Sequence, residues 1–323
     1  MKDFCVVGSG FSGAYVANQL SKKYTVEVFE KAKGLGGRSS YRRGDKNTGF
    51  DHGLQYISPK SKVFISFIKK LERKKIIKKW PGNHLDFNFK PTHSNPKYIG
   101  KTGNNIISKH LLKKIKTNCY STVSKITYKS NYWEITLKDS KKIKFKKIIL
   151  SCPFIQSKTL AKKYLNRAML NLKIKMEPNI TIMAIYKNNK NLPISSIKFN
   201  DKILGWAANE NSKKRFLSNY SLWTIQSNFK WAKNNINYYK SRKKNTTSII
   251  LNRFHNFTGL SKKEIVKSFI HGWKYSYNLK PTKYKSYWSS KYNLGLCGDW
   301  FVGPTVESSW VSANHLLKQI HSK

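Results

Sequence analysis

The feature that most constrains this chain is a glycine pattern near its first residues. Phe4-Cys5-Val6-Val7 is a short apolar run typical of a buried parallel strand, and it leads directly into Gly8-Ser9-Gly10-Phe11-Ser12-Gly13. In such a pattern the first glycine permits a tight turn and the second lets the backbone approach a pyrophosphate, while the third allows the next helix to pack closely on the strand. We therefore expect a dinucleotide at Gly8, Gly10, Phe11, Ser12 and Gly13.

An acidic residue follows at the distance that this motif requires. The run from Thr25 to Phe29 reads as a second strand, and it ends at Glu30, about twenty residues after the glycines. A carboxylate placed there accepts hydrogen bonds from the ribose hydroxyls of an adenosine and argues against a bound 2′-phosphate. Glu30 and the adjacent Lys31 are accordingly predicted to contact the cofactor.

A second glycine cluster, Gly34-Leu35-Gly36-Gly37-Arg38, favours a flavin dinucleotide over a nicotinamide one. Two adjacent glycines would let the chain pass close to a ribityl diphosphate, and Arg38 would offer a fork-shaped donor to phosphate. We expect contacts from Gly37 and Arg38. The alternative is a flexible surface turn beside a solvated arginine.

The far end of the sequence supplies a matching segment. Leu294 to Cys297 reads as a short buried strand that runs into Gly298-Asp299, and Thr305 is a plausible N-cap of a following helix. We expect Asp299 to bind a ribityl hydroxyl and the amides near Thr305 and Val306 to face the N1 and C2 carbonyl edge of the flavin. An ordinary strand-to-helix connection is the alternative. Three further cofactor contacts are predicted, at Gln55, Tyr56 and the backbone of Val123.

Length and composition bound the class of protein. The 323 residues, 39% of them hydrophobic, suffice for two domains with their own cores. Because the sequence contains neither an apolar run of membrane-spanning length nor a signal-peptide core, we expect a cytoplasmic protein. The four cysteines are far apart and read as small core residues rather than disulfide or zinc partners, so no metal is predicted.

The charge balance is extreme, with 63 Lys plus Arg against 15 Asp plus Glu and a formal net charge of +48. Such a surface invites a nucleic-acid interpretation. However, the lysines are spread over nearly every expected element, and the chain is also rich in Asn, Ile, Tyr, Ser and Phe, which adenine- and thymine-rich codons specify. We therefore favour genomic base composition as the main cause, and a nucleic-acid-binding flavoprotein remains the non-enzymatic alternative.

The pattern of elements predicts α/β and α+β architecture. A Rossmann-like FAD-binding domain of the glutathione-reductase type is expected over residues 1–78, 98–157 and 290–323. A substrate domain, built on a mixed or antiparallel sheet plus helices, is expected over residues 79–97 and 158–289. Its strands are placed at 180–186, 203–208, 221–226 and 269–275, and Ser261 to Glu264 forms a capping-box pattern.

The order of these motifs resembles the bacterial renalase-like flavoproteins, a short-chain branch of the flavin amine oxidase superfamily. Beyond the glycine motifs, the matching segments are Asp51-His52-Gly53-Leu54-Gln55-Tyr56, residues 205–213, Leu222-Trp223-Thr224, His271-Gly272-Trp273-Lys274-Tyr275 and Gly298-Asp299. The resemblance implies noncovalent FAD and a substrate sheet roofing the flavin. It also implies oxidation of aberrant dihydronicotinamide isomers of NAD(P)H, with oxygen reduced to hydrogen peroxide. Two positions depart from the family, Gly272 where arginine is common and Ser39 where methionine is frequent.

The substrate pocket predicted from these segments consists of aromatic walls and polar groups that orient the substrate. Hydride transfer from an electron-rich dihydropyridine needs little acid or base help, so the protein need only stack the rings and exclude water. The candidate residues are Gln55, Trp206, Asn209, His271, Trp273 and Tyr275. Aromatic residues on a sheet face are more often plain core, and this is the alternative interpretation of each aromatic position. Amine oxidation or desaturation of another small molecule, and a flavin carrier without turnover, stay as alternatives.

Overall fold

The computed structural model describes residues 1–44, 47–92, 95–187 and 192–322, and these form two compact units. The first unit comprises Met1–Arg38, Asn105–Lys175 and the chain from Asn278 onward. The second unit comprises Ser39–Asn104 and Met176–Tyr277. This division differs from the expected domains because residues 39–78 and 98–104 pack with the second unit, whereas residues 158–175 and 278–289 pack with the first.

The first unit is built on a parallel sheet with the strand order β8-β2-β1-β11-β18. Phe4 of β1 pairs with Val26 of β2 on one side and with Lys147 of β11 on the other, which fixes the register. An antiparallel hairpin of β9 and β10 joins β11, and β17 pairs antiparallel with β18. The strands are β1 (Lys2–Val7), β2 (Val26–Phe29), β8 (Lys116–Asn118), β9 (Val123–Lys129), β10 (Tyr132–Leu137), β11 (Lys142–Leu150), β17 (Tyr287–Ser289) and β18 (Leu294–Leu296).

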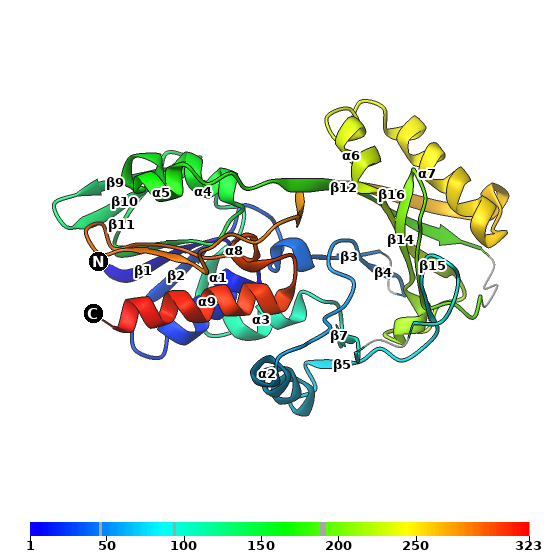
Figure 1. Cartoon of the computed structure of the whole chain (residues 1–323), viewed down its shortest axis with the longest axis horizontal. Coiled ribbons are helices and arrows are strands. Elements are labelled where there is room, and N and C mark those ends of the chain that lie inside the picture. The colour runs from blue at the N-terminus through cyan, green and yellow to red at the C-terminus, as the bar shows by residue number, and fades with distance from the viewer. Residues whose placement is uncertain (45–46, 93–94, 188–191, 323) are drawn as a thin grey trace. The chain divides into compact units, whose positions relative to one another are not determined.

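Helices of the first unit pack on this sheet, and α1, α3 and α9 lie side by side (Figure 1). Tyr15 of α1 donates its hydroxyl hydrogen to Asn314 Oδ1 of α9 at 3.1 Å, so two segments distant in sequence share one layer. The helices are α1 (Phe11–Leu20), α3 (Ile106–Leu112), α4 (Phe154–Ala161), α5 (Arg167–Leu170), α8 (Asp299–Val302) and α9 (Val306–His321), with 3-10 turns η1 (Gly37–Ser39) and η2 (Lys162–Tyr164).

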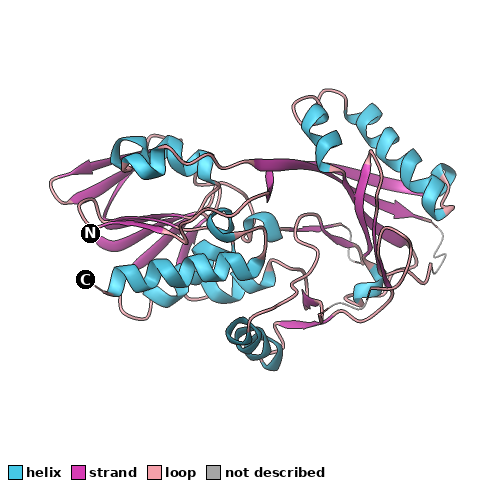
Figure 2. Ribbon diagram, in the orientation of Figure 1, coloured by secondary structure: helices cyan, strands magenta, loops and turns pink. Residues whose placement is uncertain are grey.

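The second unit contains a mixed sheet of strand order β16-β12-β15-β14-β13-β6, in which β13 pairs in parallel with β6, whereas β12 with β15, β15 with β14 and β14 with β13 pair antiparallel. Figure 2 shows helices α6 and α7 beside these strands. Ile250 and Phe254 of α7 are buried against Ile182 and Trp223 of the sheet and form its core. The elements of this sheet and its helices are β6 (His84–Leu85), β12 (Met176–Tyr186), β13 (Ser196–Lys198), β14 (Leu204–Asn209), η3 (Asn211–Lys213), β15 (Ser221–Ser227), α6 (Phe229–Asn235), α7 (Lys243–Thr258), η4 (Lys262–Glu264) and β16 (Ile265–Asn278).

Two small antiparallel pairs complete the second unit. Strand β3 (Tyr41–Arg43) pairs with β4 (Gly49–Asp51), and β5 (Ile77–Lys79) pairs with β7 (Tyr98–Gly100). Helix α2 (Lys62–Arg73) begins at the N-cap Ser61, whose side chain accepts a hydrogen bond from the Phe64 amide. Among the described residues, no helix combines the length and the apolar character needed to cross a bilayer.

The expected fold class is confirmed, and the local differences have local causes. The run from Thr117 to Tyr128 divides into β8 and β9 because Tyr120 adopts a left-handed φ of 54° that interrupts extended backbone. The capping box at Ser261 and Glu264 is confirmed, but it opens only the 3-10 turn η4. Thr305 is confirmed as the N-cap of α9, where its side chain accepts from the Ser308 amide.

Candidate functional site

The glycine motif forms a cradle at the end of β1. Gly8 adopts a φ of 105°, and a Cβ added there would lie 2.8 Å from Ser151 Oγ. A Cβ on Gly13 would lie 2.2 Å from the Gly8 carbonyl oxygen, so only glycine lets α1 pack this closely on the strand. In contrast, a Cβ on Gly10 would meet nothing within 4 Å. The backbone at Gly10 therefore faces open space at the N-terminus of α1, which is the geometry that a diphosphate requires.

Glu30 stands at the end of β2 and is already tied to this turn. Its Oε2 accepts hydrogen bonds from the amide and the hydroxyl of Ser9, at 2.9 and 2.7 Å, and its Oε1 accepts from the Ala32 amide at 2.9 Å. A carboxylate has about four acceptor positions, so capacity for a ribose hydroxyl is left. Lys31 is exposed beside it. Ser9, between the first two glycines, thus connects the glycine turn to the Glu30 carboxylate.

The second glycine cluster packs directly on the first. The Gly36 amide donates to the Ser9 carbonyl oxygen at 3.2 Å, and Gly36 forms an isolated parallel bridge with Gly10. Gly37 has a left-handed φ of 52°, and a Cβ there would lie 3.2 Å from Gly10 Cα. The two motifs, expected from sequence to serve one ligand, therefore form one continuous backbone surface.

Arg38 and Asp299, each predicted to contact the cofactor separately, form a bidentate ion pair in the structure. Arg38 Nη1 donates to Asp299 Oδ2 at 2.8 Å, and Nη2 donates to Oδ1. Gly298 precedes Asp299, and its amide donates to Ser312 Oγ of α9 at 3.0 Å. Any cofactor contact by Arg38 or Asp299 would consequently come from a preoriented pair. Thr305 and Val306 begin α9, and Val123 is buried at the start of β9.

The predicted substrate residues of β16 share one face of the strand. His271, Trp273 and Tyr275 alternate with Gly272 and Lys274, and all three are half-buried. The Trp273 ring stacks on His52 at a centroid distance of 5.2 Å, and its Nε1 donates to the His52 carbonyl oxygen at 2.9 Å. The His271 ring lies 4.8 Å from His52 and 4.4 Å from Trp273. Within the described part of the second unit, the Tyr275 ring contacts none of these three rings.

Both histidines of this group are held neutral. Burial and the neighbouring His271 lower the pKa of His52 to about 3, while burial together with Arg42 and Lys240 lowers the pKa of His271. His52 is 9% exposed, and its Nδ1 has no hydrogen-bond partner among the described residues. The buried indole nitrogen of Trp206 is likewise unpartnered within the described part of the chain. Buried polar atoms are normally satisfied, so these two atoms are positions where a ligand would supply the missing bond.

The other predicted pocket residues have structural partners. Gln55 Nε2 donates to the Asp51 carbonyl oxygen, and Tyr56 lies between Trp80 and Trp206 at ring distances of 6.2 and 5.8 Å. Asn209 is buried, and its Oδ1 accepts from the Asn211 amide at 3.0 Å, which shapes the turn after β14. The structure therefore groups His271 and Trp273 with His52, groups Trp206 with Tyr56, and gives Asn209 a turn-forming role.

Gly272 lies on the opposite face of β16 from the histidine and tryptophan. A Cβ added at Gly272 would lie 2.4 Å from the Tyr239 ring and 2.9 Å from Ile236 Cδ1. An arginine at this position would have no room without displacing these side chains. Because position 272 lies on the opposite face of β16, having glycine there in place of arginine does not change the face that carries His271 and Trp273.

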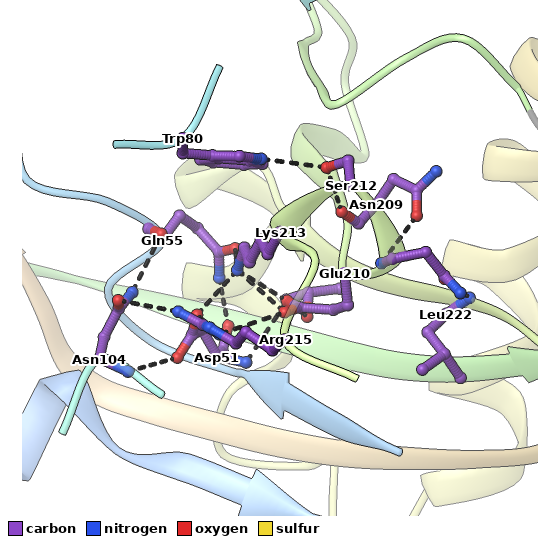
Figure 3. A network of polar contacts seen from close by, with 12 residues as sticks. Asp51, Gln55, Trp80, Asn104, Asn209, Glu210, Ser212, Lys213, Arg215 and Leu222 are labelled. Carbon is purple, nitrogen blue, oxygen red and sulfur yellow. Dashed lines mark hydrogen bonds and ion pairs between the residues drawn. The ribbon is translucent and has the colours of Figure 1, made fainter. Parts of the chain in front are cut away.

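Sequence reasoning did not identify the buried ion-pair network of Asp51, Glu210, Lys213 and Arg215 (Figure 3). Lys213 Nζ lies 2.8 Å from Asp51 Oδ2 and 3.0 Å from Glu210 Oε2, and Arg215 Nη1 lies 2.5 Å from Asp51 Oδ2. All four side chains are at most 1% exposed. Two carboxylates are thus balanced by two cations, so the network carries no net charge in its fully ionised state.

The network holds the segment that bears His52 and Gln55. Asp51 Oδ1 accepts from the Asn104 amide at 2.8 Å, and Lys213 Nζ lies 3.4 Å from Gln55 Oε1. Burial raises the pKa of Glu210; for Asp51 burial acts in the same direction, but the Arg215 and Lys213 charges outweigh it and lower the pKa. The signal available in the sequence was the spacing of one acid and two bases at Glu210, Lys213 and Arg215, in a chain with few acids.

Comparison with known proteins agrees with the fold. The NAD(P)-binding Rossmann-like domain family matches residues 6–71. A protein from Exiguobacterium sp. 255-15, provisionally assigned as a protoporphyrinogen oxidase, superposes with a TM-score of 0.75 at 10% identity, over 99% of this chain and 98% of that one. Wild-type putrescine oxidase bound to putrescine superposes with a TM-score of 0.70 at 12% identity, over 99% of both chains. At these identities the likeness establishes the fold, a Rossmann-like domain with a second sheet domain, as found in FAD-dependent oxidoreductases.

Proposed function

We propose that this chain is an FAD-dependent oxidoreductase that oxidises a small dihydronicotinamide-type molecule, such as an aberrant isomer of NAD(P)H, and passes the electrons to oxygen. The observation that carries the cofactor assignment is the cradle formed by both glycine motifs, with its open face at Gly10. Around it, Glu30 would hold the adenosine ribose, and the Arg38–Asp299 pair would hold the ribityl diphosphate. The bound flavin would supply a two-electron acceptor for hydride.

The remaining residues proposed for the cofactor are those that the sequence indicated. In the first unit these are Gly8, Phe11, Ser12, Gly13, Lys31, Gly37, Val123, Gly298, Thr305 and Val306, and in the second unit Gln55 and Tyr56. We accordingly propose the first unit as the FAD-binding domain and the second as the substrate domain.

The second unit supports a neutral, planar substrate. His52 and His271 are neutral at physiological pH, and Trp273 presents a ring stacked on His52. The unpartnered His52 Nδ1 and Trp206 Nε1 would bind polar groups such as a carboxamide. A dihydropyridine stabilises its own developing cation through the ring nitrogen, so orientation and exclusion of water are what these residues need to provide.

Amine oxidation is the second candidate, and it is favoured by the fold shared with putrescine oxidase. An ammonium substrate requires a carboxylate or an aromatic cage. However, Asp51 and Glu210 are buried and already paired with Lys213 and Arg215, so neither is available to an amine. This pairing supports the proposal of a dihydronicotinamide substrate over an amine that would need a free carboxylate.

The test begins with the absorption spectrum of the purified protein, which should show bound flavin. Under anaerobic conditions, dihydronicotinamide isomers should bleach the flavin band, whereas putrescine and aromatic amines should leave it unchanged. Trp273→Phe, which removes the bond to the His52 carbonyl oxygen, should slow bleaching without loss of flavin. The matched variant Trp231→Phe, in a half-buried tryptophan on α6, should bleach like the wild type. A colourless folded protein, or bleaching by amines alone, would refute the proposal.

A further inference from the structure

The second unit contains a cavity of about 420 Å³ that the proposed oxidation does not use. Its walls come from the end of α2, from β5, from the turn after β7 and from the residues that follow η3. The lining residues are Glu72, Lys75, Ile77, Lys78, Lys101, Thr102, Lys214 and Arg215. None of them belongs to the residues proposed to bind FAD or the substrate.

The lining has five basic side chains and a single carboxylate; one of the five, Arg215, is paired with the buried Asp51, so the excess positive charge comes from the four lysines. Basic residues are abundant throughout this chain, so the proportion alone says little. What distinguishes these five is that separate segments bring them to the wall of one cavity. Charges that face a common concave space produce a higher potential there than charges spread over a convex surface.

Two of the five cations are fixed in place. Arg215 Nε donates to the Gly100 carbonyl oxygen at 2.9 Å, Nη2 donates to Asn104 Oδ1 at 3.2 Å, and the side chain is 1% exposed. Lys78 is half-buried, and its Nζ donates to the Lys214 carbonyl oxygen at 2.7 Å. Lys78 is therefore a preorganised cation of the cavity, which lowers the entropic cost of holding a ligand, and Arg215, whose charge Asp51 balances, fixes the wall beside it.

The backbone around the cavity is also constrained. Lys75 and Lys214 adopt left-handed φ values of 56° and 47°, and the Lys101 amide donates to the Ile76 carbonyl oxygen at 2.9 Å. Lys78 itself lies on β5, where it pairs with Ile99 of β7. The exposed ammonium groups of Lys75, Lys101 and Lys214 therefore extend from fixed positions, although their own side chains remain mobile enough to close on a ligand.

The pKa of Lys78 is affected by its position among these groups. Burial and the charges of Arg215, Lys101 and Lys214 lower its pKa. A multivalent anion in the cavity would offset the like-charge part of this effect, because it would place negative charge near Lys78, Lys101 and Lys214.

We propose that this cavity binds a compact polyanion of the polyphosphate class, either inorganic or as the phosphate chain of a nucleotide. Lys78 supplies a fixed positive charge, Arg215 holds the wall through its bonds to Gly100 and Asn104 while its own charge is balanced by Asp51, the exposed lysines close around the phosphates, and the Thr102 hydroxyl adds a hydrogen bond. The polyanion site is independent of the flavin chemistry.

The experiment is a calorimetric titration of the purified protein at 0.15 M salt, where the Debye length of about 8 Å suppresses diffuse attraction. Inorganic tripolyphosphate and ATP are the two probes, and we expect saturable binding of at least one of them at one site per chain. Tighter binding of ATP would identify a nucleotide as the source, whereas equal or tighter binding of tripolyphosphate would identify the phosphate chain alone. A short single-stranded oligonucleotide serves as the third titrant.

Matched variants decide whether the cavity is the site. The triple variant Lys75→Gln, Lys101→Gln and Lys214→Gln removes three exposed lysines from the cavity and should weaken binding by at least about tenfold. A control triple variant, Lys141→Gln, Lys142→Gln and Lys144→Gln, removes three exposed lysines from the first unit and should change affinity by less than about twofold.

The single variant Lys78→Gln gives an independent reading, and it should also weaken binding while the thermal midpoint confirms folding. Three results would overturn the proposal: no saturable binding, equal losses in the two triple variants, or an oligonucleotide that binds more tightly than either probe and is unaffected by the cavity substitutions.

Discussion

Removing one cation from the buried network should destabilise the second unit strongly. In Lys213→Met the two carboxylates of Asp51 and Glu210 face Arg215 alone, with all these side chains at most 1% exposed. Breaking a buried ion pair by deleting one partner typically costs about 3–5 kcal/mol, because the remaining charge is left uncompensated. We expect the free energy of unfolding in urea at pH 7 to fall by that amount.

The double variant Lys213→Met with Glu210→Gln tests the reason for that loss. It restores the balance of one carboxylate to one cation, and a glutamine oxygen can still accept from Thr224, whose Oγ lies 2.7 Å from Glu210 Oε1. The double variant should therefore be more stable than the sum of the two single effects predicts, by about 1–3 kcal/mol.

A pH series provides a second reading of the same reasoning. Burial already raises the pKa of Glu210, and the loss of the Lys213 charge should raise it further. A folded-state pKa above the unfolded value means that the folded state binds more protons, so stability increases as pH falls. The deficit of Lys213→Met should therefore be smaller at pH 5.5 than at pH 8. Strict additivity in the double variant, together with a deficit independent of pH, would refute the charge-balance account.

Three further predictions follow from single sites. The pKa of His52 drops to about 3 on folding, so protonation favours the unfolded state below pH 6.5. Between pH 7 and pH 5, the free energy of unfolding of the wild type, measured in urea, should therefore fall by about 2 kcal/mol more than that of His52→Gln. Equal losses in the two proteins would count against a buried neutral histidine. Gly13→Ala places a Cβ 2.2 Å from the Gly8 carbonyl oxygen, so it should lower the thermal midpoint by several degrees and abolish flavin retention during gel filtration, and full retention would contradict the cradle. Gly272→Ala should lower the thermal midpoint by crowding Tyr239, yet leave the flavin spectrum unchanged; an altered spectrum with normal stability would show that position 272 faces the ligand.

The parts of the fold that could be predicted from the sequence are those set by local backbone chemistry. The left-handed turn at Gly8 and the cap at Thr305 depend on residues within a few positions of each other, so both can be recognised from the sequence alone. The central strands of the first unit could also be predicted, because parallel strands that are buried on both faces appear in the sequence as continuous apolar runs.

The buried network could not be predicted in the same way. Asp51 and Lys213 are 162 positions apart, and nothing in the sequence distinguishes a buried lysine from the other residues among the 63 lysines and arginines. Pairing of Arg38 with Asp299 was also out of reach, since each was interpretable alone as a ligand contact. The position of Gly272 depended on strand parity, which the exact start of β16 fixes. In each case the missing information was a long-range contact or a register.

The sharing of one layer by α1 and α9 has a consequence for synthesis at the ribosome. Ser12 Oγ donates to the Ser309 carbonyl oxygen across a separation of 297 positions, so the early half of the nucleotide cradle emerges long before its covering helix exists. During that interval the apolar surface of α1 is unprotected, and newly made chains would depend on slow elongation or on chaperones to avoid association.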